Sequence, residues 1–144
     1  MKAVIQRVTR ASVRSGPLAA AIGPGLLVLV GLETGDTEET CAWAAAKIAS
    51  LRVFEDGAGK LNLGLAEVNG EILAISQFTL AGSIAKGRRP SFDQAMAPDP
   101  ARVLFMKFLE LLKARHPQVK SGFFQEHMEV ELVNDGPVTL ILER

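Results

Sequence analysis

Apolar and polar residues alternate in the C-terminal part of the chain. From Met128 to Leu132 every second side chain is apolar, and Glu129 and Glu131 occupy the positions between them. A period of two is typical of a β-strand with one buried face. A second apolar run, Val138–Leu142, also has the composition of a strand. The sequence therefore predicts two β segments joined by a short polar link.

The link is Asn134-Asp135-Gly136-Pro137. Pro137 has no N–H to donate to a neighbouring strand, and Gly136 has no side chain that would keep another group away from the backbone. The simplest interpretation is an ordinary turn. A second interpretation is a backbone site for an amino group, in which a cis Gly136–Pro137 bond would point both carbonyl oxygens to the same side.

Two longer segments have the pattern of helices. Thr37–Ser50 is rich in alanine and begins with acidic residues, which favour a helix N-terminus. Its residues Cys41, Ala44, Ala45 and Ile48 share one face, which we expect to be buried. Pro100–Arg115 has an apolar face as well, and Asp99 is placed to cap its start.

The remaining apolar runs predict strands. Leu26–Val30 is continuously apolar, which indicates a central strand that is buried on both faces. Asn69-Gly70 is a typical hairpin turn, and a strand should follow it. That strand is Glu71–Leu80. The other expected strands, in chain order, are Lys2–Val8, Leu18–Ile22 and Leu51–Phe54.

Two polar stretches are candidates for chemistry. The apolar part of Glu71–Leu80 ends in Ser76-Gln77-Phe78-Thr79, which either enters solvent or builds a site at the end of a rigid strand. Further along, Lys86-Gly87-Arg88-Arg89-Pro90 is a compact basic segment. It is either a solvated loop or a contact for a phosphate backbone.

Composition and charge limit the function classes. The chain has 144 residues without repeats or low-complexity linkers, so we expect a single domain, 1–144. Sixteen basic and sixteen acidic residues balance, so any polyanion would have to be held by a local patch. Arg7, Arg10 and Arg14 are expected to share a solvated edge. Because Cys41 is the only cysteine, and because neither a signal peptide nor a membrane span is visible, we expect a soluble cytoplasmic protein without a membrane partner.

The usual catalytic motifs are missing. His116 and His127 are the only histidines, no Cys pair is present, and neither a metal site nor a cofactor is predicted. No base is visible near Cys41 that would activate it, so a packed core thiol is expected. A catalytic site with so few ionisable groups would have to act by placement and backbone hydrogen bonds.

The two long motifs together resemble the D-aminoacyl-tRNA deacylase family of the bacterial type. These motifs are Ser76-Gln77-Phe78-Thr79-Leu80 and Asn134-Asp135-Gly136-Pro137-Val138-Thr139. Shorter similarities extend the resemblance over essentially the whole chain, at residues 6–13, 25–31, 52–54, 60–63 and 89–92. The chain departs from the family pattern at Ser121-Gly122, at Gly82–Ile84, at Glu126-His127 and in the first hairpin, residues 15–21. These departures concern the pocket rim and the tRNA contacts.

The resemblance implies a homodimer with active sites at the subunit interface. It would hydrolyse the ester between a D-amino acid and the 3′ end of tRNA, and would also remove glycine mischarged onto tRNA-Ala. Gly136 and Pro137 of one subunit, joined by a cis bond, would hold the amino group in the site of the other and exclude an L side chain.

The resemblance also implies roles for the polar strand end. Backbone N–H groups near Gln77 and Phe78 would stabilise the oxyanion, while the Ser76 and Gln77 side chains position the site. Thr79 would have a positioning role rather than act as a nucleophile. Water would attack with help from the terminal 2′-hydroxyl of the tRNA. Two further residues, Phe124 and Met128, would line the pocket of the terminal adenosine.

We therefore expect an α+β fold, with a strongly bent, mostly antiparallel, barrel-like sheet and two main helices. Two other functions remain open. The chain could bind tRNA ends or D-amino acids without turnover, because of the departures near His127. It could also be a hydrolase that depends on the Cys41 thiol or on the Thr79 hydroxyl.

Overall fold

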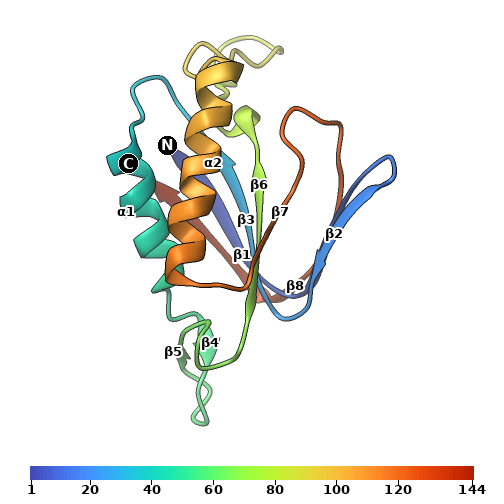
Figure 1. The fold of residues 1–144 in the computed structure, drawn as a ribbon, viewed down its shortest axis with the longest axis vertical. Coiled ribbons are helices and arrows are strands. Elements are labelled where there is room, and N and C mark those ends of the chain that lie inside the picture. The colour runs from blue at the N-terminus through green and yellow to red at the C-terminus, as the bar shows by residue number, and fades with distance from the viewer.

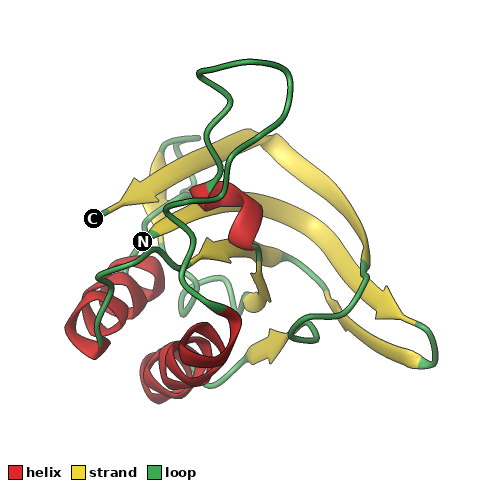
Figure 2. Cartoon of the chain, turned by 90° about the horizontal axis from the view of Figure 1, so that it is seen from above, coloured by secondary structure: helices red, strands yellow, loops and turns green.

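The computed structural model describes all residues from Met1 to Arg144, and it shows the expected α+β architecture. Both helices lie side by side against one side of a bent sheet (Figures 1 and 2). The helices are α1 (Glu38–Ala49) and α2 (Pro98–Arg115), and a short 3₁₀ helix, η1, spans Phe78–Ala81. The strands are β1 (Lys2–Ser15), β2 (Leu18–Ile22), β3 (Gly25–Gly31), β4 (Phe54–Glu55), β5 (Leu61–Leu63), β6 (Glu71–Ser76), β7 (Val119–Ser121) and β8 (Glu129–Glu143).

Strand β1 organises the main sheet. It pairs antiparallel with β2, β3 and β8, while β3–β6 and β6–β7 are parallel, which gives the order β2-β1-β3-β6-β7 with β8 also on β1. The first half of β1 pairs with β3 and its second half pairs with β2. The β1–β8 register shifts between Gln6 and Arg10, as expected of bulges, which bend a sheet. The predicted bent, mostly antiparallel sheet is confirmed.

The hydrophobic core has two parts. The larger part lies between the sheet and the helices, and contains the predicted α1 face of Cys41, Ala44, Ala45 and Ile48. The smaller part is formed by side chains of β1, β2, β3 and β6, among them Val8, Leu73 and Ile75. Strand β3 contributes to both parts, since Leu26 lies in the larger one and Leu27 in the smaller one. Burial of Leu26–Val30 on both faces is therefore confirmed.

Several predicted boundaries are wrong. Strand β6 ends at Ser76, and the predicted continuation to Leu80 is the 3₁₀ helix. The predicted strand Leu51–Phe54 is reduced to Phe54–Glu55, because its pairing with Leu61–Leu63 begins only at Phe54. Strand β1 continues past Val8 to Ser15, because its second half pairs with both β2 and β8.

The structure also differs from the predictions for one hairpin, one helix cap and the C-terminal strands. Asn69-Gly70 does not form a hairpin: Asn69 has a φ of 51°, but the strand that follows, β6, pairs in parallel with β3. Helix α2 begins at Pro98, so Asp99 lies in its first turn and does not cap it. The two C-terminal β segments are one strand, β8, and the polar link lies inside it as a bulge.

Candidate active site

The end of strand β6 lies at the wall of a cavity. Ser76 pairs with Val30 of β3, and the Gln77 N–H donates to the Val30 carbonyl at 2.7 Å. The chain then turns into η1, where the N–H groups of Phe78 and Thr79 have no acceptor within the chain. The first N–H groups of a helix are unpaired because the carbonyls they would reach lie before its start. The polar strand end therefore offers backbone donors on a rigid support.

The side chains of this segment contact one another. The Gln77 Nε2 donates to the Thr79 Oγ1 at 2.5 Å, so the Thr79 hydroxyl is held by an amide and not by a basic group. Ser76, Gln77 and Phe78 line the cavity, whereas Thr79 does not. No group of histidine, cysteine or carboxylate side chains is arranged to hold a metal ion. The arrangement supplies hydrogen-bond donors and an apolar surface.

The cavity has a volume of about 750 Å³, and 11 of its 17 lining residues are hydrophobic. This volume falls within the range of small-molecule sites. The opposite wall comes from residues 124–128, which include the predicted pocket residues Phe124 and Met128. The loop before α2 closes one side with Phe92 and Met96. The structure thus brings five of the eight predicted site residues together: Ser76, Gln77, Phe78, Phe124 and Met128.

Packing fixes the opposite wall. The Arg102 guanidinium lies 4.7 Å from the centre of the Phe124 ring, and its Nη2 donates to the Gln125 Oε1 at 2.6 Å. The Met128 sulfur accepts from the Phe123 N–H at 3.3 Å. Gly122 permits this approach, because a Cβ there would lie 3.0 Å from the same sulfur. Glu126 and His127, the departures from the family pattern, lie on the exposed rim of the cavity.

The Gly136–Pro137 joint lies elsewhere. Its peptide bond is cis, and both residues are exposed. The Asn134 side chain closes the bulge: its Oδ1 accepts from the Val138 N–H at 2.8 Å, and its Nδ2 donates to the Thr139 Oγ1 at 3.0 Å. These bonds hold the backbone on both sides of the joint.

The buried side chain of Arg7 also contacts the joint. Only 5% of Arg7 is exposed, so its predicted place on a solvated edge is wrong. Its Nε donates to the Asp135 carbonyl at 2.8 Å and its Nη1 to the Val53 carbonyl at 2.7 Å, while the Glu55 carboxylate lies 3.5 Å from its Nη2. A signal for this burial was present, because position 7 continues the inward alternation of Ala3 and Ile5.

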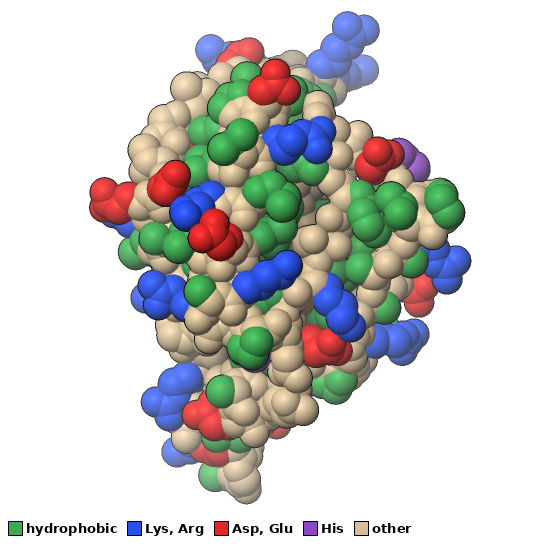
Figure 3. Space-filling model, in the orientation of Figure 1, with side chains coloured by type: hydrophobic (Ala, Val, Ile, Leu, Met, Phe, Trp, Pro, Cys, Tyr) green, Lys and Arg blue, Asp and Glu red, His purple; other side chains and the backbone are tan.

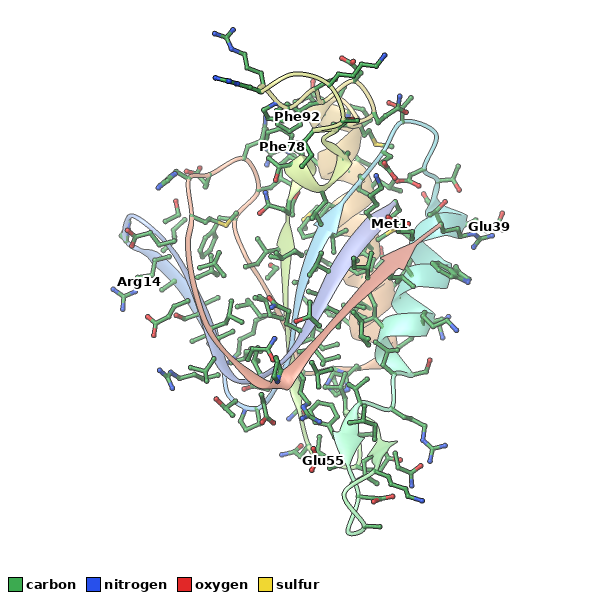
Figure 4. All side chains as sticks on the ribbon, turned by 180° about the vertical axis from the view of Figure 1, so that it is seen from behind. Met1, Arg14, Glu39, Glu55, Phe78 and Phe92 are labelled. Atoms are coloured by element: carbon green, nitrogen blue, oxygen red, sulfur yellow. The ribbon has the colours of Figure 1, made fainter.

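The joint and the strand end at Ser76 lie apart in the sheet. Ser76 is aligned, through Val30, with Ala3 of β1, whereas the joint lies between the partners of Gln6 and Val8. This separation is three to five residues along β1, or about 10–16 Å at the rise of a strand. Figure 4 shows Phe78 at one end of the molecule and Glu55, the neighbour of Arg7, at the other. One chain therefore does not bring the two predicted halves of the site together.

Cys41 has the properties of a core thiol. It is fully buried in α1, and burial raises its pKa to about 11. It is not among the residues that line the cavity. This geometry removes the thiol-dependent hydrolase hypothesis for Cys41 and confirms the predicted packed thiol.

The sequence and the structure match one group of proteins. A family model described as D-Tyr-tRNA(Tyr) deacylase matches residues 4–143. The chain belongs to this family. D-aminoacyl-tRNA deacylase of Geobacter sulfurreducens is 57% identical over 144 residues, covering 99% of this chain and 95% of the relative. That of Carboxydothermus hydrogenoformans is 52% identical and covers 99% of both chains.

Solved structures extend the family comparison. A protein described as c-Myc DNA Unwinding Element Binding Protein superposes with a TM-score of 0.93 at 44% identity, covering 100% of this chain and 99% of the other. A probable eukaryotic D-amino acid tRNA deacylase superposes with a TM-score of 0.87 at 17% identity, covering 98% and 97%, which shows a shared fold. In this member of the D-Tyr-tRNA(Tyr) deacylase family, neither helix is long and apolar enough to cross a membrane.

Proposed function

We propose that this protein hydrolyses the ester bond between a D-amino acid and the 3′ end of tRNA, releasing the free D-amino acid and tRNA. Glycine mischarged onto tRNA-Ala is the second proposed substrate. The observation that carries the proposal is the polar strand end Ser76–Phe78 in the wall of an apolar cavity. It occurs in a chain that is 57% identical to a D-aminoacyl-tRNA deacylase. In this proposal residues 1–144 act as one catalytic domain, and the protein works in the cytoplasm, where charged tRNA is its substrate.

The complete site forms between two copies of the chain. The joint of one chain lies away from its own cavity, so a second copy is needed to place Gly136 and Pro137 beside Ser76–Phe78. Strand β8 offers a surface for this pairing: Ile141 is 72% exposed, and Val130 and Leu140 are exposed as well. Burial of such apolar side chains favours association. We therefore propose a homodimer with active sites at the interface.

The Gly136 and Pro137 carbonyls would receive the amino group of the substrate. A backbone site held by the Asn134 side chain and by Arg7 has little freedom to retreat. With the amino group fixed there, an L side chain would point into the joint, whereas a D side chain or the hydrogen of glycine would not. Rejection of L substrates would therefore be steric, and glycine would be accepted.

The chemical step would rely on backbone donors. Water attacks the ester carbon, and the resulting oxyanion accepts a hydrogen bond from the unpaired Phe78 N–H. The bond between the ester carbon and the 3′-oxygen then breaks, and the leaving 3′-oxygen takes up the proton lost by the attacking water, which is passed through the neighbouring 2′-hydroxyl of the terminal adenosine. Phe124 and Met128 would hold the adenine, and Ser76 and Gln77 would position the ester. Thr79 accepts a hydrogen bond from the Gln77 side chain, and its role would be to hold that side chain in position.

One experiment tests the activity and its selectivity. A single tRNA is charged separately with the D form of an amino acid, the L form and glycine, and ester loss is followed with time. The expected result is loss of the D form and glycine with the L form intact. If all three esters survive while the tRNA binds tightly, the chain is a binding protein without turnover. That alternative is favoured by Glu126 and His127 on the cavity rim.

The role of Thr79 is tested with Thr79→Val, which keeps the shape of the side chain and removes the hydroxyl. Turnover should continue at a reduced rate, since the hydroxyl positions the Gln77 side chain but lies outside the cavity wall and has no base beside it. Complete loss of turnover, in a variant that still binds tRNA with the affinity of the original protein, would instead assign Thr79 as the nucleophile.

A further inference from the structure

A closed basic loop follows the catalytic strand end. Ser83 and Ser91 form an isolated β-bridge, in which the Ser83 N–H donates to the Ser91 carbonyl at 2.8 Å and the Ser91 N–H donates back at 2.9 Å. The bridge closes the loop of residues 84–90 at its base. Gly87, with a φ of 72°, supplies the left-handed conformation that the loop requires. The loop is therefore held in a closed conformation at its base.

The charge of this loop is not neutralised. Lys86, Arg88 and Arg89 are exposed, and all nine ion pairs of the molecule involve other residues. The nearby carboxylate of Asp93 accepts a hydrogen bond from the Ser91 hydroxyl at 2.6 Å. Lysine and arginine side chains project from this end of the molecule, beyond the start of α2 (Figure 3). A chain with zero net charge thus concentrates three unpaired cations in five residues.

Aromatic packing connects the loop to the cavity. Phe92, directly after the bridge, lies with its ring centre 5.2 Å from that of Phe78, at an angle of 59°. Gly82 makes room for this ring, because a Cβ there would lie 2.8 Å from Phe92. Both phenylalanines line the cavity, yet Phe78 is 57% exposed and Phe92 is 37% exposed (Figure 4). The base of the loop and the mouth of the cavity therefore share an exposed aromatic wall.

We propose that the loop of residues 84–90 binds the sugar–phosphate backbone of the single-stranded 3′ end of the tRNA as it leaves the cavity, and that Phe92 and Phe78 form the surface against which a base of this end lies. This inference rests on the proposed function, which places the terminal nucleoside in the cavity. Cations beside exposed aromatic rings are the combination by which proteins hold single-stranded nucleic acid. The three cations would each contact one phosphate.

The first test measures binding of uncharged tRNA, which requires no turnover. In the variant Lys86→Gln/Arg88→Gln/Arg89→Gln, three phosphate contacts are lost. The plot of log affinity against log salt should become shallower by about 2, since each contact on a single strand contributes about 0.7 to the slope. If the two proteins bind equally at about 1 M salt, the same relation makes the affinity of the variant about fiftyfold weaker than that of the original protein at about 0.15 M salt. An unchanged slope would overturn the proposal, whether or not the protein proves to be a deacylase.

A matched control removes the same charge elsewhere. Lys47, Lys113 and Arg115 are exposed, outside the ion pairs, and lie in the last turns of α1 and α2, at the far end of the helices from the loop (Figure 1). Lys47→Gln/Lys113→Gln/Arg115→Gln should keep the slope of the original protein. If the slope of log affinity against log salt became as shallow in this variant as in the loop variant, tRNA binding would depend on the net charge of the protein. A specific role for the loop would then be excluded.

A second substrate separates the loop from the chemistry. D-aminoacyl-adenosine carries the ester and the terminal nucleoside but no phosphate. The loop variant should hydrolyse it at the original rate, while its KM for D-aminoacyl-tRNA rises and kcat is kept. A slower reaction on D-aminoacyl-adenosine would show that the loop acts on the catalytic site and would overturn the proposal. If the original protein cleaves neither ester, the proposed function fails, and the binding slope still decides the role of the loop.

The aromatic wall has its own variant. Phe92→Leu keeps an apolar side chain against Gly82 but removes the ring face. Affinity for a short CCA-ended RNA should fall at least fivefold, because stacking of one base contributes this much or more. Phe92→Tyr should retain binding. Equal affinities for all three proteins would remove the aromatic part of the proposal.

Discussion

Gly136→Ala should weaken folding more than alanine does at any open glycine of this chain. Gly136 has a φ of 145°, a region that L residues rarely adopt. An added Cβ would also lie 2.8 Å from both the Cγ2 and the backbone N of Val138, and 3.3 Å from the Arg7 Nη2. The substitution therefore combines backbone strain with a steric clash at the joint.

The two contributions can be separated. A non-glycine residue in a rare backbone region costs about 1–3 kcal/mol. Overpacking against groups that cannot move freely costs a further ~1–3 kcal/mol. Gly35→Ala tests the first contribution alone, because its φ is 97° and a Cβ there meets nothing within 4 Å. Gly57→Ala tests neither, since that site is open and has no positive φ.

The assay is urea unfolding at one fixed protein concentration, followed by circular dichroism. The free energy of unfolding should fall by about 2–6 kcal/mol for Gly136→Ala, by about 1–3 kcal/mol for Gly35→Ala, and by less than ~0.5 kcal/mol for Gly57→Ala. Equal values for Gly136→Ala and Gly35→Ala would refute the steric part of the reasoning. If Gly136→Ala folds, unchanged rejection of L-aminoacyl-tRNA would count against the carbonyl site.

Three further predictions concern buried or paired groups. Arg7→Met should lower the free energy of unfolding by about 2–4 kcal/mol in the same assay, because two backbone carbonyls lose a charged donor; a smaller loss than ~1 kcal/mol would contradict this. Cys41 in the folded protein should react with a thiol reagent at pH 8 at least about a hundredfold more slowly than after unfolding, since its pKa is raised from 9.0 to about 11 and the side chain is fully buried; equal rates would show that the thiol is accessible. The Gly23 N–H, and then Lys120, lower the pKa of Glu71 below 4.5, so the stability it contributes is present above pH 4.5 and is lost as the pH falls through the folded pKa. Glu71→Gln should therefore be less stable than the original protein at pH 7, and the difference should shrink as the pH falls below 4.5; a difference that stays the same from pH 7 to acid would argue against this linkage.

Local patterns in the sequence were sufficient for most elements. The α1 face of Cys41, Ala44, Ala45 and Ile48 follows from the helical period alone, and all four residues are buried. Continuous apolar sequence likewise identified Leu26–Val30 as a strand between two core regions. The first prediction succeeds because side chains three or four residues apart on a helix share a face. The second succeeds because a strand that is buried on both faces consists of apolar residues without alternation.

Contacts distant in sequence decided the rest. Asn69-Gly70 has the composition of a hairpin turn, but β6 pairs with β3 because its apolar side chains are buried there on both faces. Arg7 has the composition of a surface residue, yet carbonyl groups 46 and 128 residues away satisfy its donors in the interior.

The site shows the same division. The sequence by itself identified the motifs Ser76–Leu80 and Asn134–Thr139, since each is continuous and carries its backbone chemistry locally. It could not show that β8 places the joint beside Arg7 while the strand end opens into a cavity with Phe92 and Met128. Strand register is set by the pairing of whole strands, and a cavity is formed by side chains from several of them. Only the tertiary structure therefore decided that the two motifs lie apart within one chain.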